Sequence, residues 1–290
     1  MTSFTVIKKL KKFFPGSKLG HLGTLDPMAQ GVLPVAIGYA TRLIEYVSET
    51  DKVYRATMTL GGISDTQDAW GNIVYKSDVY FDASELPAIL ARYIGTIWQI
   101  PPMYSAVHYQ GARLYELARQ GITVDREARE IEIDYINILS TDRDGDGRPR
   151  IDLEVGCSKG TYIRTLCHDI GIELGSGAYL SALTRIRAGA FNIEKSHSLE
   201  EIQQYPDQLD LWVETVDFPL QHLERATVPP ETLVKIFNGN QVTIDAMVGA
   251  DPIRVFDSLG RLVAIAAGIS DGYGTVLQPL KVFPEKKLPG

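Results

Sequence analysis

Apolar residues near the N-terminus recur at the spacing of a helix. Phe4, Ile7, Leu10 and Phe14 lie three or four positions apart, and Ser3 stands where an N-cap residue would stand. The same spacing predicts further helical segments over 40–47, 82–94 and 161–174. In the last of these, Arg164 lies off the apolar stripe, so we expect its guanidinium to be free to face a functional site.

Alternation of apolar and polar residues predicts a strand over 53–60, with Tyr54 on its core-facing side. Strands are also predicted over 32–37, 131–139, 151–157 and 179–190, and a loop over 140–150. In the last of these strands, Leu183, Arg185 and Arg187 are two residues apart. We therefore expect them to share one face of the sheet.

A second domain is predicted after residues 224–231, where Pro229 and its neighbouring proline indicate a linker. A short helix over 232–237 and strand-like runs over 252–256, 261–268 and 274–283 follow. A compact β domain of about 60 residues fits this pattern. The chain is therefore predicted to be an α+β protein with domains at 1–225 and 226–290.

Composition indicates a globular protein. The 290 residues are 44% hydrophobic, which supports a packed core and excludes a disordered chain. The sequence lacks an apolar run of membrane-spanning length and the long apolar region of a secretory signal. Two cysteines, Cys157 and Cys167, suit a reducing compartment. We expect a cytoplasmic protein without membrane contact.

The net charge of −7 is unevenly distributed along the chain. Residues 198–260 hold 11 acidic and 3 basic residues, whereas residues 1–60 hold 8 basic and 4 acidic residues. The basic region could steer a phosphate backbone. An acidic enzyme with a small substrate fits the charge equally well.

Two apparent metal motifs do not meet the requirements for binding. Residues 142–147 imitate the start of an EF-hand, but Leu153 occupies the position of the bidentate glutamate and Pro149 interrupts the loop. We expect a polar hairpin loop there. The two cysteines and His168 do not match zinc-ligand spacings.

Residues 20–34 hold a lone acid, Asp26, among glycines, prolines and apolar residues. A carboxylate without water costs free energy unless it is paired, so Asp26 is a candidate functional group. The structural alternative is an aspartate that forms a turn ahead of Pro27.

Residues 20–34 also resemble the catalytic motif of the TruB family, the tRNA pseudouridine synthases that act on position 55 in the T-loop. Segments resembling the family's other motifs follow in order at 51–54, 104–121, 158–166 and 177–185. The resemblance therefore covers nearly the whole chain, and its ordered motifs are specific.

The resemblance implies a fold, although this sequence departs from the family's pattern in a few places. It implies a catalytic domain whose central mixed, largely antiparallel sheet is flanked by helices, an RNA-gripping thumb over about 101–121, and a PUA-like RNA-binding domain at 226–290. Family members usually begin with a strand and an Asp-Lys-Pro-x-Gly segment before the Thr-Ser that is here Thr2-Ser3. We expect such a stretch upstream of Met1 in the DNA if the start codon is miscalled. Leu22 and Tyr39 also differ from the residues common in the family.

The resemblance implies catalytic roles for three residues. Asp26 would be the nucleophile, attacking either ribose C1′ or uracil C6, and Arg164 would keep it anionic. Tyr54 would stack on the extruded uracil, and its phenol would serve in proton removal. The remaining pocket contacts fall on His21, Tyr162 and Leu183. This isomerisation needs no metal, redox cofactor or cosubstrate.

The implied enzyme is a monomer that binds the T-arm of tRNA without a guide RNA. Its target base is stacked, so the enzyme must flip it out. Two alternatives stay open. One is a tRNA-folding chaperone of the same fold that performs no chemistry, and the other is a guide-RNA-dependent relative. The thumb-like segment argues against the latter, because the guided branch lacks that insertion.

Overall fold

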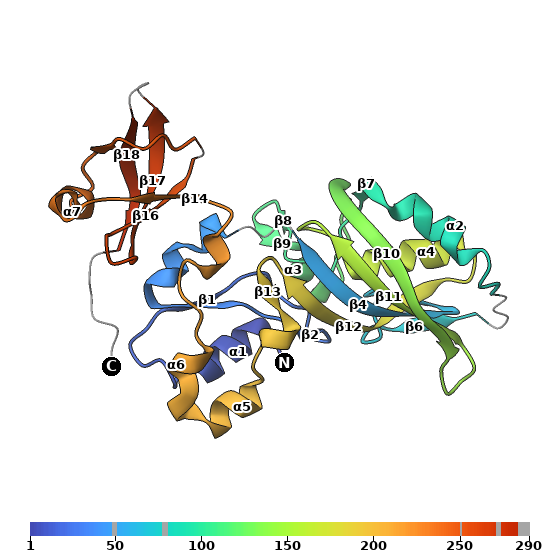
Figure 1. Ribbon diagram of the computed structural model, residues 1–290. Helices are drawn as coiled ribbons and strands as arrows, with labels where there is room; N and C mark the ends of the chain where they lie inside the picture. Colours follow the sequence, from blue (N-terminus) through green and yellow to red (C-terminus); the bar gives the residue numbers. More distant parts are fainter. Residues whose placement is uncertain (48–50, 77–80, 250, 271–273, 284–290) are drawn as a thin grey trace. The chain divides into compact units, whose positions relative to one another are not determined.

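The computed structural model describes residues 1–47, 51–76, 81–249, 251–270 and 274–283. The chain forms two compact units (Figure 1). The first contains residues 1–6, 23–34 and 49–196, and the second contains residues 7–22, 35–48 and 197–290. The units are defined by packing, whereas the domain boundary predicted at residue 225 follows chain order and stays a prediction. Within the described residues, no helix is long and apolar enough to cross a bilayer.

A seven-stranded sheet forms the centre of the first unit as the structure describes it. Its strands lie in the order β13 (Phe191–Asn192), β12 (Ala178–Ala188), β4 (Lys52–Leu60), β11 (Pro149–Cys157), β10 (Arg129–Arg143) and β7 (Gly95–Gln99), with β2 (Gln30–Gly31) beside β12. The β2–β12 pair is parallel and the other pairs are antiparallel. The predicted mixed, largely antiparallel sheet is therefore confirmed.

Helices α2 (Leu86–Leu90) and α4 (Ile163–Glu173) contribute apolar side chains to the core of this unit (Figure 1). Tyr54 lies in the same core, as the alternation along β4 predicts. Helix α4 also matches the predicted helix, and Gly175 follows it with a positive φ of 70°. The remaining elements are small: β5 (Gly62–Ser64), β6 (Ile73–Tyr75), η3 (Ala91–Tyr93), β8 (His108–Tyr109), β9 (Ala112–Arg113), α3 (Leu114–Arg119) and η4 (Ile193–Lys195).

The predicted thumb segment forms a short hairpin, β8–β9, followed by α3. Leu114 anchors α3 and is 1% exposed, whereas Arg113 and Arg119 are exposed. Arg119 lies over the ring of Tyr115, with the guanidinium carbon 5.3 Å from the ring centre. Its proposed part in gripping RNA stays a prediction.

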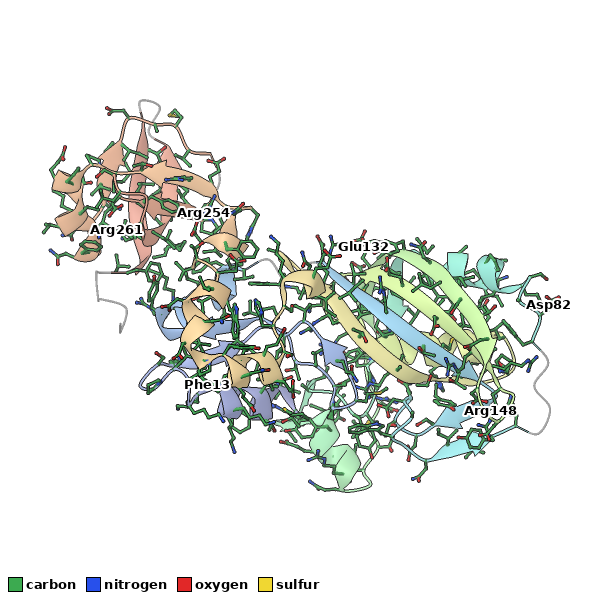
Figure 2. The ribbon with its side chains drawn as sticks, turned by 60° about the horizontal axis from the view of Figure 1, so that its bottom comes forward. Phe13, Asp82, Glu132, Arg148, Arg254 and Arg261 are labelled. Atoms are coloured by element: carbon green, nitrogen blue, oxygen red, sulfur yellow. The ribbon has the colours of Figure 1, made fainter. Side chains whose placement is uncertain are left out.

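Several predicted boundaries are wrong. The loop expected over 140–150 belongs largely to β10 and β11, which continue as a hairpin. Its tip is a polar turn, as predicted, where the Asp144 carboxylate accepts bonds from the backbone N–H groups of Asp146 and Arg148. Figure 2 labels Arg148, whose Nη1 lies 2.8 Å from the Asp146 carboxylate.

The first predicted helix is also shorter than expected. Helix α1 (Ser3–Leu10) ends at Leu10, and the hydroxyl of Thr2, not Ser3, accepts the N–H bond of Thr5. The helices expected over 82–94 and 40–47 form only in part. The first becomes α2 and η3, and the second becomes the 3₁₀ turns η1 (Gly38–Arg42) and η2 (Ile44–Tyr46).

The strand predicted over 32–37 forms only at its end, as β3 (Val35–Ile37) in the second unit, where β3 pairs with β1 (Leu19–His21). Strand β2 in the first unit precedes the predicted range. Pro34 lies between the two paired segments and has no N–H to donate to a ladder.

The expectation that Leu183, Arg185 and Arg187 share a face is wrong for Arg187. A β-bulge between Arg185 and Arg187 inserts one residue into β12. Leu183 and Arg185 pair with Ala56 and Tyr54 on the core face, whereas Arg187 is exposed.

The second unit contains a five-stranded sheet among its described residues. The order is β14 (Glu224–Thr227), β16 (Ile253–Phe256), β17 (Leu262–Ser270), β18 (Thr275–Val282) and β15 (Val242–Ile244). Apolar side chains from α7 (Pro230–Phe237) pack on it. The remaining elements of this unit are α5 (Leu199–Gln204), η5 (Pro206–Gln208), α6 (Leu209–Trp212) and η6 (Phe218–Leu220). The predicted small C-terminal β domain is therefore confirmed, although β14 and β15 were not predicted.

Candidate active site

Asp26 lies in a turn that is fixed on both sides. Its backbone carbonyl accepts a hydrogen bond from the N–H of Ala29 at 2.9 Å, with Pro27 at the second position of the turn. The hydroxyl of Ser3 accepts the N–H of Leu25 at 3.0 Å, which explains why Ser3 does not cap α1. The turn interpretation of Asp26 is thus correct for its backbone, and its side chain remains available for another contact.

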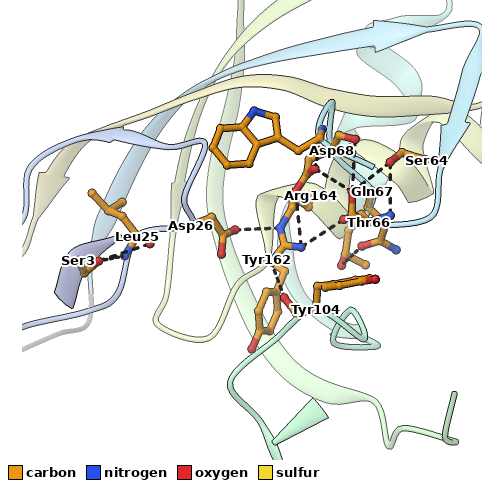
Figure 3. A network of polar contacts seen from close by, with 12 residues as sticks. Ser3, Leu25, Asp26, Ser64, Thr66, Gln67, Asp68, Tyr104, Tyr162 and Arg164 are labelled. Atoms are coloured by element: carbon orange, nitrogen blue, oxygen red, sulfur yellow. Dashed lines mark hydrogen bonds and ion pairs between the residues drawn. The ribbon is translucent and has the colours of Figure 1, made fainter. Parts of the chain in front are cut away.

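The side chain of Asp26 pairs with Arg164 (Figure 3). Oδ2 of Asp26 lies 2.8 Å from Nε of Arg164. The Nε group is buried without a well-aligned hydrogen bond, so the contact is best described as an ion pair. The Arg164 side chain is 4% exposed and the Asp26 side chain is 37% exposed. The carboxylate is therefore only partly exposed, while the guanidinium that pairs with it is enclosed.

Three further groups hold the guanidinium of Arg164 in place (Figure 3). Nη1 donates to the carbonyl of Thr66 at 3.2 Å, and Nη2 donates to the carbonyl of Tyr104 at 2.9 Å. A second carboxylate, that of Asp68, lies 3.8 Å from Nη1. Because α4 begins at Ile163, Arg164 is fixed by the first turn of a buried helix as well as by these contacts.

Burial raises the pKa of Asp26 above its usual value of 3.8. The guanidinium of Arg164 acts in the opposite direction, and the nearby charge of Asp68 raises the pKa further. The resemblance implies that Arg164 keeps Asp26 anionic. Its charge does favour the anion, but loss of water outweighs it in the free protein.

Tyr54 is 8% exposed and stands on β4 directly opposite Arg185 on β12. Burial raises the pKa of the Tyr54 phenol to about 12, and the charge and hydrogen bond of Arg185 oppose that rise. The charge of Asp26 also reaches Tyr54 and raises its pKa. The phenol is therefore protonated at neutral pH and is not a ready base in the resting protein.

Tyr162 and Leu183 belong to the same unit as these groups. Gln99 holds the backbone of Tyr162 at two points, accepting its N–H at 2.8 Å and donating to its carbonyl at 3.1 Å. Leu183 is 7% exposed and lies on the core face of β12 with Tyr54. His21 lies on β1 in the second unit, and its role stays a prediction.

Sequence reasoning assigned no role to Asp68 or Arg185. Asp68 is 7% exposed and accepts bonds from the Thr66 hydroxyl at 2.7 Å and the Trp70 N–H at 3.0 Å. It had no clear sequence signal, because it lies in a polar run that reads as an ordinary loop. Arg185 did have a sequence signal, since a charged residue at a core-facing position of a predicted strand is unusual.

Comparison with known proteins identifies similar sequences over most of the chain. A family model described as "TruB family pseudouridylate synthase (N terminal domain)" matches residues 11–163. A second, described as "tRNA pseudouridylate synthase B C-terminal domain", matches residues 164–235.

Two proteins similar over nearly their whole length are both named tRNA pseudouridine synthase B. The chain is 50% identical to tRNA pseudouridine synthase B of Syntrophomonas wolfei, over 98% of this chain and 95% of that protein. It is 41% identical to the protein of that name from Moorella thermoacetica, again over 98% and 95%.

A solved structure shares the fold. A chain in a crystal structure of a Cbf5-Nop10-Gar1 complex superposes with a TM-score of 0.72 at 26% identity, covering 97% of this chain and 81% of that one. The mixed α+β architecture described above is therefore found in a known structure.

Proposed function

We propose that this chain, which belongs to the TruB family of pseudouridylate synthases and is a tRNA pseudouridine synthase, an isomerase, acts on uridine 55 of the T-loop through Asp26. The observation that supports this proposal best is the 2.8 Å pair between the partly exposed Asp26 carboxylate and the buried Arg164 guanidinium. A carboxylate that is open on one side and oriented on the other suits nucleophilic attack on a bound substrate.

The reaction exchanges one bond to the ribose for another. The bond between C1′ and N1 of uracil breaks, a bond between C1′ and C5 forms, and the C5 hydrogen is lost as a proton while N1 gains one. Attack by Asp26 on C1′ or on C6 forms a covalent intermediate that divides this exchange into easier steps. The carboxylate leaves again when the new bond is complete.

The target nucleotide must leave its stack to reach Asp26, at a cost of a few kcal/mol. We propose that the ring of Tyr54 stacks on the flipped uracil and that Leu183 and Tyr162 form the pocket wall. In this proposal His21 fills the space that the flipped base leaves or contacts the displaced loop. Because the Tyr54 phenol has a pKa of about 12, it would act as a stacking platform and hydrogen-bond donor until the intermediate forms.

The remaining contacts would come from shape recognition of the folded T-arm. The thumb segment, with exposed Arg113 and Arg119, and the C-terminal β domain are the proposed RNA-binding surfaces. We propose that the protein acts as a monomer and that it needs no guide RNA.

The target position is tested on a free T-arm stem–loop transcript without any guide RNA. Carbodiimide-based mapping should find pseudouridine at position 55 and nowhere else. A matched transcript with cytidine at that position should remain unmodified. Pseudouridine at another position of the loop would contradict the proposed target.

The same experiment separates the enzyme from the chaperone alternative. A chaperone would bind the transcript and leave every uridine unmodified. Modification that appears only when a guide RNA is added would instead favour the guided mode of action.

A further inference from the structure

Arg185 contacts both ends of the loop that carries Asp26. Its Nη2 donates to the carbonyl of Gly23 at 2.9 Å, and its Nε donates to the carbonyl of Val32 at 2.8 Å. Gly23 precedes Asp26 and Val32 follows it, so one planar guanidinium joins the two ends of the loop. The Arg185 side chain comes from β12, far from the loop in sequence.

The backbone of Arg185 holds the same loop. Its carbonyl accepts the N–H of Val32 at 2.9 Å, and β2 pairs in parallel with Thr184 and Arg185. Gly31 has a φ of 100°, and a Cβ there would lie 2.2 Å from the Arg185 carbonyl oxygen. The close approach of the loop to β12 therefore requires glycine at this position.

The guanidinium of Arg185 also reaches the other side of the site. Tyr54 is its direct cross-strand partner, and the charge of Arg185 acts to lower the pKa of the Tyr54 phenol. The same residue therefore bonds to both ends of the loop that carries the proposed nucleophile and stands opposite the residue whose ring is proposed to stack on the base. Figure 3 shows the neighbouring contacts by which Arg164 holds Asp26 itself.

This arrangement is costly for the fold. Arg185 is 1% exposed, and no carboxylate among the described residues lies within ion-pair distance of it. A buried charge that is met by carbonyl dipoles and not by a carboxylate is less stable than an apolar side chain at the same place. Its rigid fork, however, can fix several acceptors at once, which an apolar side chain or a lysine cannot do.

Arg164 and Asp68 are the charged groups that shift the pKa of Asp26. The direct contacts of Arg185 are instead with the backbone at the two ends of the loop, so its effect on the nucleophile is expected through the geometry of the loop.

We propose that Arg185 is a positioning residue that holds the Asp26 loop and the Tyr54 ring in register for attack on the flipped uridine. This inference rests on the proposed role of Asp26. A shift of about 1 Å between reacting groups can cost about 100-fold in rate. Substitution of Arg185 should therefore lower kcat and leave the affinity for RNA nearly unchanged.

The test compares Arg185→Met and Arg185→Lys with the parent in steady-state assays on the T-arm stem–loop. Arg185→Met should lower kcat about 100-fold and Arg185→Lys at least about 10-fold, with the dissociation constant of the stem–loop within about threefold of the parent. The acidic limb of the rate–pH profile should stay where it is in the parent. Arg187→Met is the matched control, because Arg187 lies two residues further along β12 and is exposed, and it should keep full activity.

Stoichiometric RNA binding and circular dichroism establish the folded fraction in each sample. If Arg185→Met does not fold, Arg185→Lys decides the question, because it retains the charge and loses the fork. Parent-like kcat in Arg185→Lys would overturn the proposal, as would a loss of RNA affinity that accounts for the whole loss of activity. If Asp26→Asn remains active, the proposed function fails. If Asp26→Asn is inactive and both Arg185 variants are fully active, only this inference fails.

Discussion

Asp26→Asn is expected to lower the rate of pseudouridine formation by at least about 10⁴-fold, since an amide cannot form the covalent intermediate. Stem–loop binding should stay within about threefold of the parent, because the amide has nearly the same volume and the RNA contacts lie elsewhere. Single-turnover assays with enzyme in excess measure the first quantity, and filter binding measures the second. Asp134→Asn is the control, as Asp134 is an exposed aspartate on β10 of the same unit.

The same substitution should not destabilise the protein. Burial raises the pKa of Asp26 in the folded state, so its ionised form costs folding free energy at neutral pH. That cost disappears as the pH falls through the raised pKa. An uncharged asparagine removes it at every pH, so the unfolding midpoint of Asp26→Asn at neutral pH should equal or exceed that of the parent. A clearly lower midpoint, or activity within a few-fold of the parent, would contradict the account.

Arg164→Met is expected to shift the pH dependence of the reaction and to slow it. In the parent, the rate should fall in acid as Asp26 takes up its proton, with a midpoint above 3.8. Without the guanidinium that opposes burial, Asp26 binds its proton more tightly, and the acidic limb should move up by about one unit or more. Loss of an oriented charge should also lower the plateau rate by about 10²–10³-fold. The rate of the chemical step, measured against pH, tests both effects.

Two variants separate charge from packing at this position. Arg164→Lys keeps the charge, so its acidic limb should stay near that of the parent, while its plateau falls because lysine cannot contact Asp26, Thr66 and Tyr104 together. Arg92→Met is the matched control, because Arg92 is 68% exposed and pairs with Glu173 away from Asp26. An unchanged acidic limb in folded Arg164→Met would show that this guanidinium does not influence the nucleophile.

The sequence predicted those parts of the fold and site where a local pattern and the tertiary structure agree. The apolar face predicted from the alternation along β4 lies in the core, and Tyr54 belongs to it. The apolar stripe of α4 left Arg164 beside it, and the structure buries that residue against Asp26. Their catalytic roles come from the resemblance and stay predictions.

Other features depend on partners that are distant in the chain. The β-bulge between Arg185 and Arg187 turns Arg187 away from the core, and a period of two residues cannot reveal one inserted residue. Strand β14 was not predicted because its stabilising partner, β16, pairs with it in parallel from nearly thirty residues further on. The charges that set the pKa of Asp26 could not all be predicted, because they include Asp68, whose proximity to Arg164 is set by tertiary packing.

The most direct test of the central claim is rapid acid quenching of the parent with T-arm RNA, followed by mass spectrometry of the nuclease- and protease-treated mixture. The account predicts a transient peptide that contains Asp26 and is heavier by one nucleotide, and this peptide should be absent in Asp26→Asn. A nucleotide attached to a different residue, or full turnover by Asp26→Asn without any adduct, would contradict it.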